Sequence, residues 1–255
     1  MEKKYRLLEN ETIIVNGKTL YRIEALRDFS DVKKGEKGGY IEKEENLSHD
    51  GNCWVLDNAL VYDEARVYDD ALVADYAQVF SEAQVYGHAR ILESAHVYGG
   101  AKIFDYAYIY NDAFINGNAR IYGEARIYEN ARVSDDARVY DNARVYENAR
   151  IYDKAQVYDN ARVYGDAEIS NNAQICGFAE AYDYARIFGD TRICDNARVY
   201  GSAQVYGKAK VHDYACVYGH VHIFEDISIF GDSKVDSEEY KIEMNKKNQL
   251  KQLKP

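Results

Sequence analysis

Three residues with redox or metal-binding chemistry, Cys176, Cys194 and His212, follow one another at equal intervals along the chain. Cysteine and histidine are zinc ligands, and two neighbouring cysteines can form a disulfide. A structural period equal to that interval would place the three side by side, with the two cysteine Cα atoms within disulfide reach. A flat, open line of groups is nevertheless poor geometry for a tetrahedral metal. We therefore expect no metal site, and we expect Cys176 and Cys194 to be free thiols in a reducing compartment.

The other histidines are the remaining candidates for acid, base or ligand roles. His88 and His220 fall at turn positions of the repeat described below, His96 and His222 fall at outward strand positions, and His49 precedes the repeat. The sequence singles out no carboxylate as an orienting partner for them, and neither a Gly-rich phosphate loop nor a Ser/His/Asp set is recognisable. We expect His49 to be a hydrogen-bonded residue rather than a base, and we expect no catalytic residue and no cofactor.

A six-residue repeat must position these side chains. It runs from Gly51 to Asp236 as 31 hexads without insertion or deletion, and each reads turn–turn–Ala–x–Val/Ile–aromatic. A fixed period of this length predicts a solenoid. Ala and Val alternate with Arg and Tyr, as in a strand with one buried face. We expect Ala and Val inside, because the opposite orientation would bury unpaired arginines. The first two positions hold mainly Asp, Asn, Gly, Glu and Ser, which turn the chain.

Three such sides close a triangle, so the hexads predict an all-β, single-stranded triangular parallel β-helix in which each coil consists of three hexads. About ten coils at a spacing of ~4.8 Å give a rod roughly 50 Å long. The spacing of the aliphatic and small residues resembles the hexapeptide repeat of left-handed parallel β-helices. Left-handedness is implied by this resemblance alone, because it breaks the usual rule for crossover connections.

The chain divides into three parts. Residues 51–236 form the solenoid, and residues 1–50 are expected to be a β cap with a hairpin turn at Asn16-Gly17. The cap protects the exposed strand edge at the end of the solenoid. Trp54, Leu60 and Leu72 occupy outward positions in the first coils, so we expect the hairpin to pack over them. Residues 237–255 are predicted to form a C-terminal capping helix with a frayed tail, beginning at Ser237.

Residues three hexads apart stack on successive coils, which sorts the sequence into three faces that differ in composition. One face carries seven consecutive tyrosines beside a column rich in arginine, and we call it the Tyr/Arg face. The aromatic column of the second face is interrupted at Asn116, Ser134 and Ser170, and that of the third ends at Cys176. The residues proposed for binding are Tyr110, Arg126, Tyr128, Arg144, Tyr146, Arg162, Tyr164, Tyr182, Arg198, Tyr200 and Tyr218.

Two explanations of the Tyr/Arg face are compatible. Stacked Tyr and Arg columns stabilise parallel strands through ring stacking and cation–π contacts, each worth ~0.5–1 kcal/mol. Tyrosine and arginine are also enriched in the hot spots of protein interfaces. Because the other two faces accept Asn, Ser, Cys and His at the aromatic position, the fold does not require Tyr there, which favours a binding role for this face.

A segment of the cap resembles a known family. Gly38-Gly39-Tyr40-Ile41-Glu42 followed by Asn46-Leu47-Ser48-His49, running into the Asp-Asn-Ala-x-Val-Tyr repeats, is similar to the YdcK-type β-solenoid proteins of bacteria and prophages. The resemblance covers the cap and the array. It implies the fold and a mobile-element setting, in which we expect a phage or prophage inhibitor of a host protein, including a defence protein. Members of the family are called transferases by analogy with hexapeptide-repeat acyltransferases.

Composition narrows the function further. The net charge is −11, and residues 51–236 hold 29 acidic against 17 basic residues, which disfavours direct nucleic-acid binding. The chain shows no apolar signal core or membrane-spanning run, so we expect a cytoplasmic protein. We expect a non-catalytic rod that binds a protein partner or a second copy of itself. An acyltransferase-like enzyme is one alternative, although the array has no projecting loop. An acidic nucleic-acid mimic, built from the Asp- and Glu-rich corners, is the other.

Overall fold

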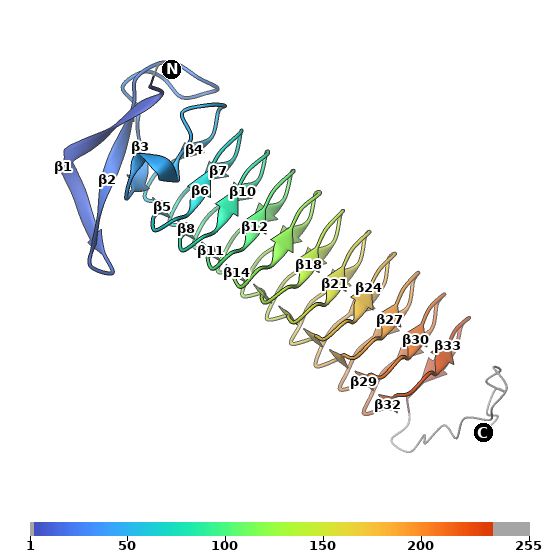
Figure 1. The fold of residues 1–255 in the computed structure, drawn as a ribbon. Helices are drawn as coiled ribbons and strands as arrows, with labels where there is room; N and C mark the ends of the chain where they lie inside the picture. Colours follow the sequence, from blue (N-terminus) through green and yellow to red (C-terminus); the bar gives the residue numbers. More distant parts are fainter. Residues whose placement is uncertain (1–2, 237–255) are drawn as a thin grey trace.

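The hexads form one short strand each, and the strands stack into three parallel sheets that enclose a narrow core (Figure 1). The computed structural model describes residues 3–236. Each solenoid strand pairs in parallel with the strands three hexads before and after it, as Arg144 does with Arg126 and Arg162. The predicted coil of three hexads, one on each face, is confirmed. The predicted C-terminal helix lies outside the described residues.

The Tyr/Arg face is an 11-stranded sheet. Its strands are β4 (Trp54–Val55), β7 (Leu72–Val73), β10 (Arg90–Ile91), β13 (Tyr108–Ile109), β16 (Arg126–Ile127), β19 (Arg144–Val145), β22 (Arg162–Val163), β25 (Glu180–Ala181), β28 (Arg198–Val199), β31 (Cys216–Val217) and β34 (Lys234–Val235).

The second face belongs to a 13-stranded sheet that also takes in the cap strands. Its solenoid strands are β5 (Leu60–Val61), β8 (Gln78–Val79), β11 (His96–Val97), β14 (Phe114–Ile115), β17 (Arg132–Val133), β20 (Arg150–Ile151), β23 (Glu168–Ile169), β26 (Arg186–Ile187), β29 (Gln204–Val205) and β32 (His222–Ile223).

The third face is a 10-stranded sheet. Its strands are β6 (Arg66–Val67), β9 (Gln84–Val85), β12 (Lys102–Ile103), β15 (Arg120–Ile121), β18 (Arg138–Val139), β21 (Gln156–Val157), β24 (Gln174–Ile175), β27 (Arg192–Ile193), β30 (Lys210–Val211) and β33 (Ser228–Ile229).

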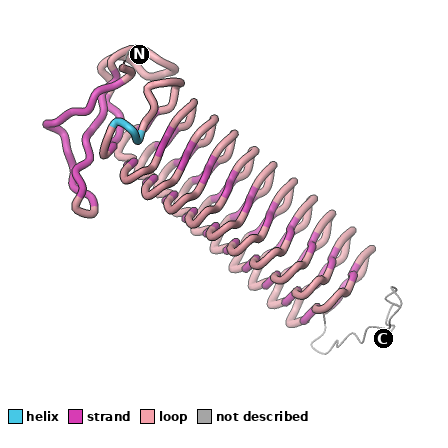
Figure 2. The backbone as a smooth tube through the Cα atoms, viewed as in Figure 1, coloured by secondary structure: helices cyan, strands magenta, loops and turns pink. Residues whose placement is uncertain are grey.

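The core consists of the Ala and Val/Ile positions. From Cys53 to Ile229 these inward side chains are at most 4% exposed, whereas the arginines of the strands are exposed. The predicted inward and outward orientation of the hexad is therefore confirmed. A tube of short strands joined by tight corners follows directly from it (Figure 2).

The first residue of every hexad adopts a left-handed backbone conformation. Its φ is 53–61° where it is not glycine. The side chain at this corner commonly accepts a hydrogen bond from the backbone N–H one coil later: Gly177 N–H donates to Asp159 Oδ2 at 3.0 Å, and Asn171 N–H to Asp153 Oδ2 at 2.9 Å. Aspartate and asparagine tolerate this backbone region better than most residues. Each corner acid thus also satisfies a backbone donor of the next coil.

The cap contains β1 (Tyr5–Val15), β2 (Lys18–Ala25), β3 (Lys37–Ile41) and the 3₁₀ turn η1 (Glu44–Asn46). The predicted hairpin is confirmed, since β1 and β2 pair antiparallel around Asn16 and Gly17, both at positive φ. Strand β3 pairs in parallel with β5, and Leu47 bridges to Val67. The cap therefore supplies the first rung of two solenoid faces.

The expected packing of the hairpin over the outward apolar residues is confirmed at Trp54. Trp54 is 2% exposed and packs edge-on against Tyr5 of β1 and Phe29, with ring centroids 6.1 and 5.2 Å away. Leu60 lies opposite Tyr40 of β3, and Leu72 packs partly buried against the core.

The motif that carries the family resemblance has a structural role in this cap. A Cβ at Gly38 would lie 2.4 Å from the Val55 carbonyl oxygen, and one at Gly39 would lie 2.6 Å from that of Ala59. Only glycine permits this close approach of β3 to the first coil. The Asn46 side-chain amide donates to the carbonyl oxygens of Asp63 and Ala65 at 3.0 and 2.9 Å. The motif therefore fastens the cap to the solenoid.

Candidate functional site

The seven tyrosines of the Tyr/Arg face form one continuous stack. Successive rings from Tyr110 to Tyr218 have centroids 4.8–5.0 Å apart and planes within 7° of parallel. Each inner ring is covered on both faces by its neighbours. The stack therefore offers ring edges and phenol groups to a partner, and it leaves no inner ring face open for stacking a base or a sugar.

The stack makes its phenol groups hard to ionise. Burial, reinforced by the neighbouring Tyr200, raises the pKa of Tyr182 to about 12. Burial, followed by the charge of Glu180, also raises the pKa of Tyr164 above its ordinary value. These hydroxyls are therefore neutral hydrogen-bonding groups at physiological pH.

Beside the stack runs the arginine column, which contains one acidic residue. Glu180 lies between Arg162 and Arg198, with N–O distances of 3.7 and 3.4 Å. The side chains of the two arginines are 50% and 57% exposed, and that of Glu180 is 20% exposed. The carboxylate therefore holds two guanidinium groups at the surface of the sheet without burying them.

Three of the predicted arginines line a shallow groove of about 440 Å³. One wall is formed by strand residues Arg144, Arg162, Glu180 and Arg198. The other wall is the preceding corner, with Asn142, Asn160, Phe178 and Asn196. The tyrosines of the stack do not line this groove. The corner wall was not predicted from the sequence, although Phe178 is the one phenylalanine at the second position of any hexad.

The other two faces also carry aromatic stacks, which qualifies the contrast drawn from the sequence. On the third face six rings stack without a break from Tyr68 to Tyr158. On the second face, shorter stacks run from Tyr62 to Tyr98 and from Phe188 to Phe224. The Tyr/Arg face therefore differs in the length of its stack and in its tyrosine-only composition, and not in the presence of stacking.

The prediction that Cys176 and Cys194 are free thiols is wrong for this structure. They form a disulfide, with Cα atoms 4.6 Å apart. Both occupy the aromatic position on neighbouring coils of the third face, and without rings to separate them the two sulfur atoms meet. His212, one coil further, stacks on Phe230 instead, with centroids 5.7 Å apart. Because the cysteines are bonded to each other, they supply no thiolate for the three-residue metal site considered above.

His212 does meet acidic groups at the adjoining corner. Its Nδ1 lies 3.3 Å from Asp213 Oδ2, and Asp195 is close enough for the three to surround a cation. Both aspartates already act as corner acceptors, for the N–H groups of Asp213 and Gly231 respectively. The ordinary corner arrangement therefore accounts for the position of both carboxylates.

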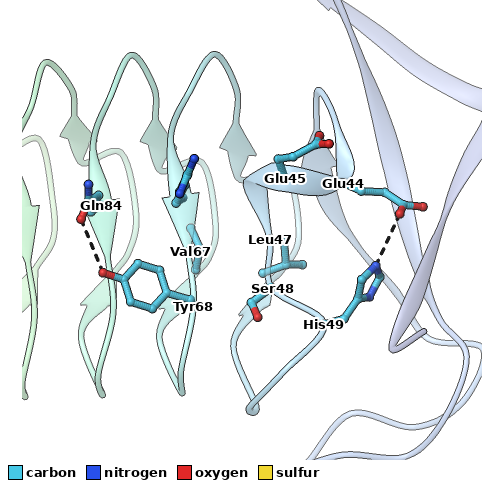
Figure 3. Close-up of a pocket in the computed structure, with 9 residues that line it drawn as sticks. Glu44, Glu45, Leu47, Ser48, His49, Val67, Tyr68 and Gln84 are labelled. Carbon is cyan, nitrogen blue, oxygen red and sulfur yellow. Dashed lines mark hydrogen bonds and ion pairs between the residues drawn. The ribbon is translucent and has the colours of Figure 1, made fainter. Parts of the chain in front are cut away.

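A second hollow lies where the cap meets the third face (Figure 3). His49 and Glu44 line it on the cap side, and Tyr68 and Gln84 on the solenoid side. His49 Nδ1 accepts the Lys4 N–H at 3.2 Å, which confirms a hydrogen-bonded role for this ring. Its buried Nε2 makes no hydrogen bond and lies 3.6 Å from Glu44 Oε2. The structure thus supplies a neighbouring carboxylate that the sequence did not single out.

Comparison with known proteins identifies the repeat. Residues 83–99, 137–153, 155–171 and 191–207 match the family described as YdcK beta solenoid repeat. These four stretches of the solenoid are similar to the YdcK-type β-solenoid repeat. A stretch of 71 residues is 37% identical to a protein of Escherichia coli K12 called "Uncharacterized acetyltransferase YdcK". That match covers 25% of this chain and 22% of the E. coli protein.

Within residues 3–236 there is no helix long and apolar enough to cross a membrane.

Proposed function

We propose that this solenoid is a non-catalytic rigid rod that binds a macromolecular partner through its Tyr/Arg face. The observation that carries the proposal is the unbroken stack from Tyr110 to Tyr218 running parallel to the exposed Arg126, Arg144, Arg162 and Arg198. Tyrosine and arginine are enriched among the few residues that dominate binding energy in protein interfaces. Here they form a flat strip along most of the rod.

Rigidity supports this role. Every strand of the face is hydrogen-bonded to its neighbours in the stack, and the Val/Ile and Ala side chains beneath are buried. A partner that docks on such a strip does not have to order it first, so little conformational entropy is lost on binding. The same surface is open to a protein partner or to a second copy of the chain.

The biological setting is part of the proposal. The likeness to solenoids of bacteria and prophages favours a host protein, including a defence protein, as the partner, and a cytoplasmic location. The net charge of −11 weighs against nucleic acid as that partner. The acidic corners add the alternative that the rod imitates a nucleic-acid backbone and occupies a DNA-binding protein.

The test compares two matched triple variants. Tyr146→Ala, Arg162→Ala and Tyr164→Ala together remove the centre of the Tyr/Arg face. Arg150→Ala, Tyr152→Ala and Arg186→Ala remove one tyrosine and two arginines from the second face. Interface aromatic and Arg residues commonly contribute ~1–2 kcal/mol or more each. We expect the first triple to weaken partner binding or self-association by several kcal/mol and the second to do much less.

The readouts are sedimentation equilibrium for self-association and co-purification of the tagged chain with a bound host protein. Circular dichroism and thermal melting establish that both triples are folded. Equal effects of two folded triples would contradict the assignment of the Tyr/Arg face.

A second candidate, acyl transfer, is favoured by the hollow at the cap junction. It contains a histidine beside a carboxylate, and the E. coli protein that matches part of this chain is called an acetyltransferase. The hollow contains suitable residue types, but the orientation of His49 is unfavourable for a general base. Because Nδ1 of His49 accepts the Lys4 N–H, the neutral ring carries its proton on Nε2 and offers the hollow no lone pair.

Incubation with acetyl-CoA and a panel of amine and hydroxyl acceptors tests this candidate. We expect no release of free CoA above background. Release that disappears in His49→Gln would instead establish the junction as a catalytic site.

A further inference from the structure

The groove on the Tyr/Arg face has a charge opposite to that of the whole chain. Three arginines and one glutamate line it, in a protein of net charge −11. The two ion pairs to Glu180 are long, at 3.4 and 3.7 Å, and half-exposed. Exposed pairs of this kind contribute little. Arg144 forms no ion pair within residues 3–236. The guanidinium groups are therefore available for carboxylates, which they bind in bidentate geometry.

The corner wall offers free amides. Asn118 and Asn172, at equivalent corners elsewhere, donate to Asp136 and Asp190 on the next coil. By contrast, the side chains of Asn142, Asn160 and Asn196 make no hydrogen bond to any described residue. Side-chain amides carry both a donor and an acceptor, so they match the N–H and C=O groups of an extended peptide backbone.

Phe178 interrupts this row of amides. It is 63% exposed and belongs to the hexad of β25, which departs from the repeat at three positions. Phe178 replaces a polar corner residue, Glu180 replaces arginine, and Ala181 replaces Val or Ile. Since asparagine occupies the same corner one coil before and one coil after, the fold does not require phenylalanine there. Its exposed ring is an apolar contact in the middle of a polar groove.

We propose that this groove binds an acidic, extended peptide segment of the partner. The inference rests on the proposed function and names the chemistry of the partner. Arg144, Arg162 and Arg198 bind the carboxylates of the segment, the three asparagines bind its backbone, and Phe178 contacts one of its apolar side chains.

A single-stranded nucleic acid fits the groove less well. Bases bind by stacking on a series of open aromatic faces, and Phe178 is the single aromatic residue among those that line the groove. Asp141, Asp159 and Asp195 stand at the same corner, immediately before the three asparagines. A phosphate backbone, which carries a charge on every nucleotide, cannot turn its charges away from these carboxylates, whereas a peptide can direct its acidic side chains toward the arginines.

The test is fluorescence anisotropy with the full chain and three labelled probes. The first is a decapeptide of Glu and Asp with one central Leu, the second replaces every acid by Gln or Asn, and the third is a short oligo-dT. We expect the acidic peptide to bind at least tenfold more tightly than the neutral one and than oligo-dT. Equal binding of the two peptides, or tighter binding of oligo-dT, overturns the proposal.

Two single variants locate the site. Phe178→Asn introduces the residue that neighbouring coils carry, and we expect it to weaken acidic-peptide binding at least fivefold. Tyr184→Asn removes an equally exposed aromatic, 64% exposed, from a corner outside the groove, and we expect no change. Unchanged peptide binding in Phe178→Asn overturns the assignment of the peptide to this groove.

The two proposals fail in different ways. If the Tyr146/Arg162/Tyr164 triple loses its partner while Phe178→Asn retains both partner and peptide, binding through the Tyr/Arg face is supported and the groove proposal is contradicted. If neither change affects binding of the partner, the proposed function is contradicted as well.

Discussion

The corner aspartate shows how much one side chain contributes in this fold. Sequence reasoning assigns the corner acids to turn formation and solvation, since Asp is common in turns. In the structure Asp159 also accepts the N–H of Gly177, one coil later, and so satisfies a backbone group that no strand partner reaches. This second role was not predictable from a single hexad, because it links two successive coils through a side chain.

Substitution of one corner separates its two contributions. We expect Asp159→Asn to be close to wild type, because Asn171 accepts the Gly189 N–H in the same way at 3.1 Å. Asp159→Gly keeps the left-handed backbone and loses the acceptor, at a cost of about 1–2 kcal/mol. Asp159→Ala loses both and is expected to be the least stable of the three. Urea unfolding measures the order, and an alanine variant as stable as the asparagine variant would contradict it.

The inward and outward positions of the hexad can be tested by single substitutions. Val145 is completely buried, so Val145→Asp places a carboxylate in the core and should lower the free energy of unfolding by several kcal/mol. Arg144, its neighbour in β19, is exposed, and Arg144→Glu should cost under ~1 kcal/mol. Thermal melts of the two variants compare them directly. The reverse ranking would be incompatible with the core described here.

At the scale of the element, the aromatic stacks couple stability to alkaline pH. The pKa of Tyr140 and that of Tyr182 rise from 10.0 to about 12, first through burial and then through neighbouring tyrosines. A raised folded pKa gives stability that is complete below pH 10 and is lost as the pH climbs toward about 12. We expect phenolate absorbance to appear late and together with unfolding. Ionisation of these tyrosines near pH 10 in the folded protein would contradict this.

The disulfide joins two neighbouring rungs of the third face, and its effect can be measured. Closing a loop of 18 residues restricts the unfolded chain by about 3 kcal/mol in the chain-entropy account. Cys176→Ala with Cys194→Ala should therefore lower the free energy of unfolding by about 2–3 kcal/mol. Alkylation of the denatured wild type without a reductant should label Cys53 and Cys216 only. Four labelled cysteines would show that the bond is absent in solution.

At the scale of the whole molecule, the sequence predicts the architecture better than the site. The period of six determines the strands, corners, core and faces, because nearly every hexad repeats two turn residues followed by a short strand with inward Ala and Val or Ile. The groove was not predicted because its walls come from the second and fourth positions of the hexad. The Tyr/Arg face was defined from the fourth and sixth positions, so the second position was not considered. Phe178 and the free asparagines can be recognised as part of a groove only once the structure shows that they lie beside Arg144, Arg162 and Arg198. The pairing of His49 with Glu44 was missed for a similar reason, since it depends on how η1 folds against the first coil.

Internal deletions test the independence of the faces. Removing residues 75–92 takes one strand from each face and leaves every residue that lines the groove in register, so peptide binding should persist. Removing residues 165–170 takes one strand from the second face and moves every later hexad to the neighbouring face, so Phe178, Glu180 and Arg198 no longer stack on Arg144 and Arg162. We expect both proteins to melt cooperatively and only the second to lose the groove, as measured by acidic-peptide anisotropy. Retained binding in the six-residue deletion would contradict the description of the faces.

The uninterrupted spacing of 18 residues between stacked positions has a consequence for how such a rod changes over generations. Because successive coils repeat the same hexad pattern, duplication or loss of a segment that encodes a whole coil would leave the pattern in register. A gain or loss of one coil changes the length of the rod but keeps every column of side chains on its own face. A gain of one hexad moves all later hexads to the neighbouring face and so interrupts every column. The length of such a rod can therefore change in steps of one 18-residue coil while its three faces stay in register.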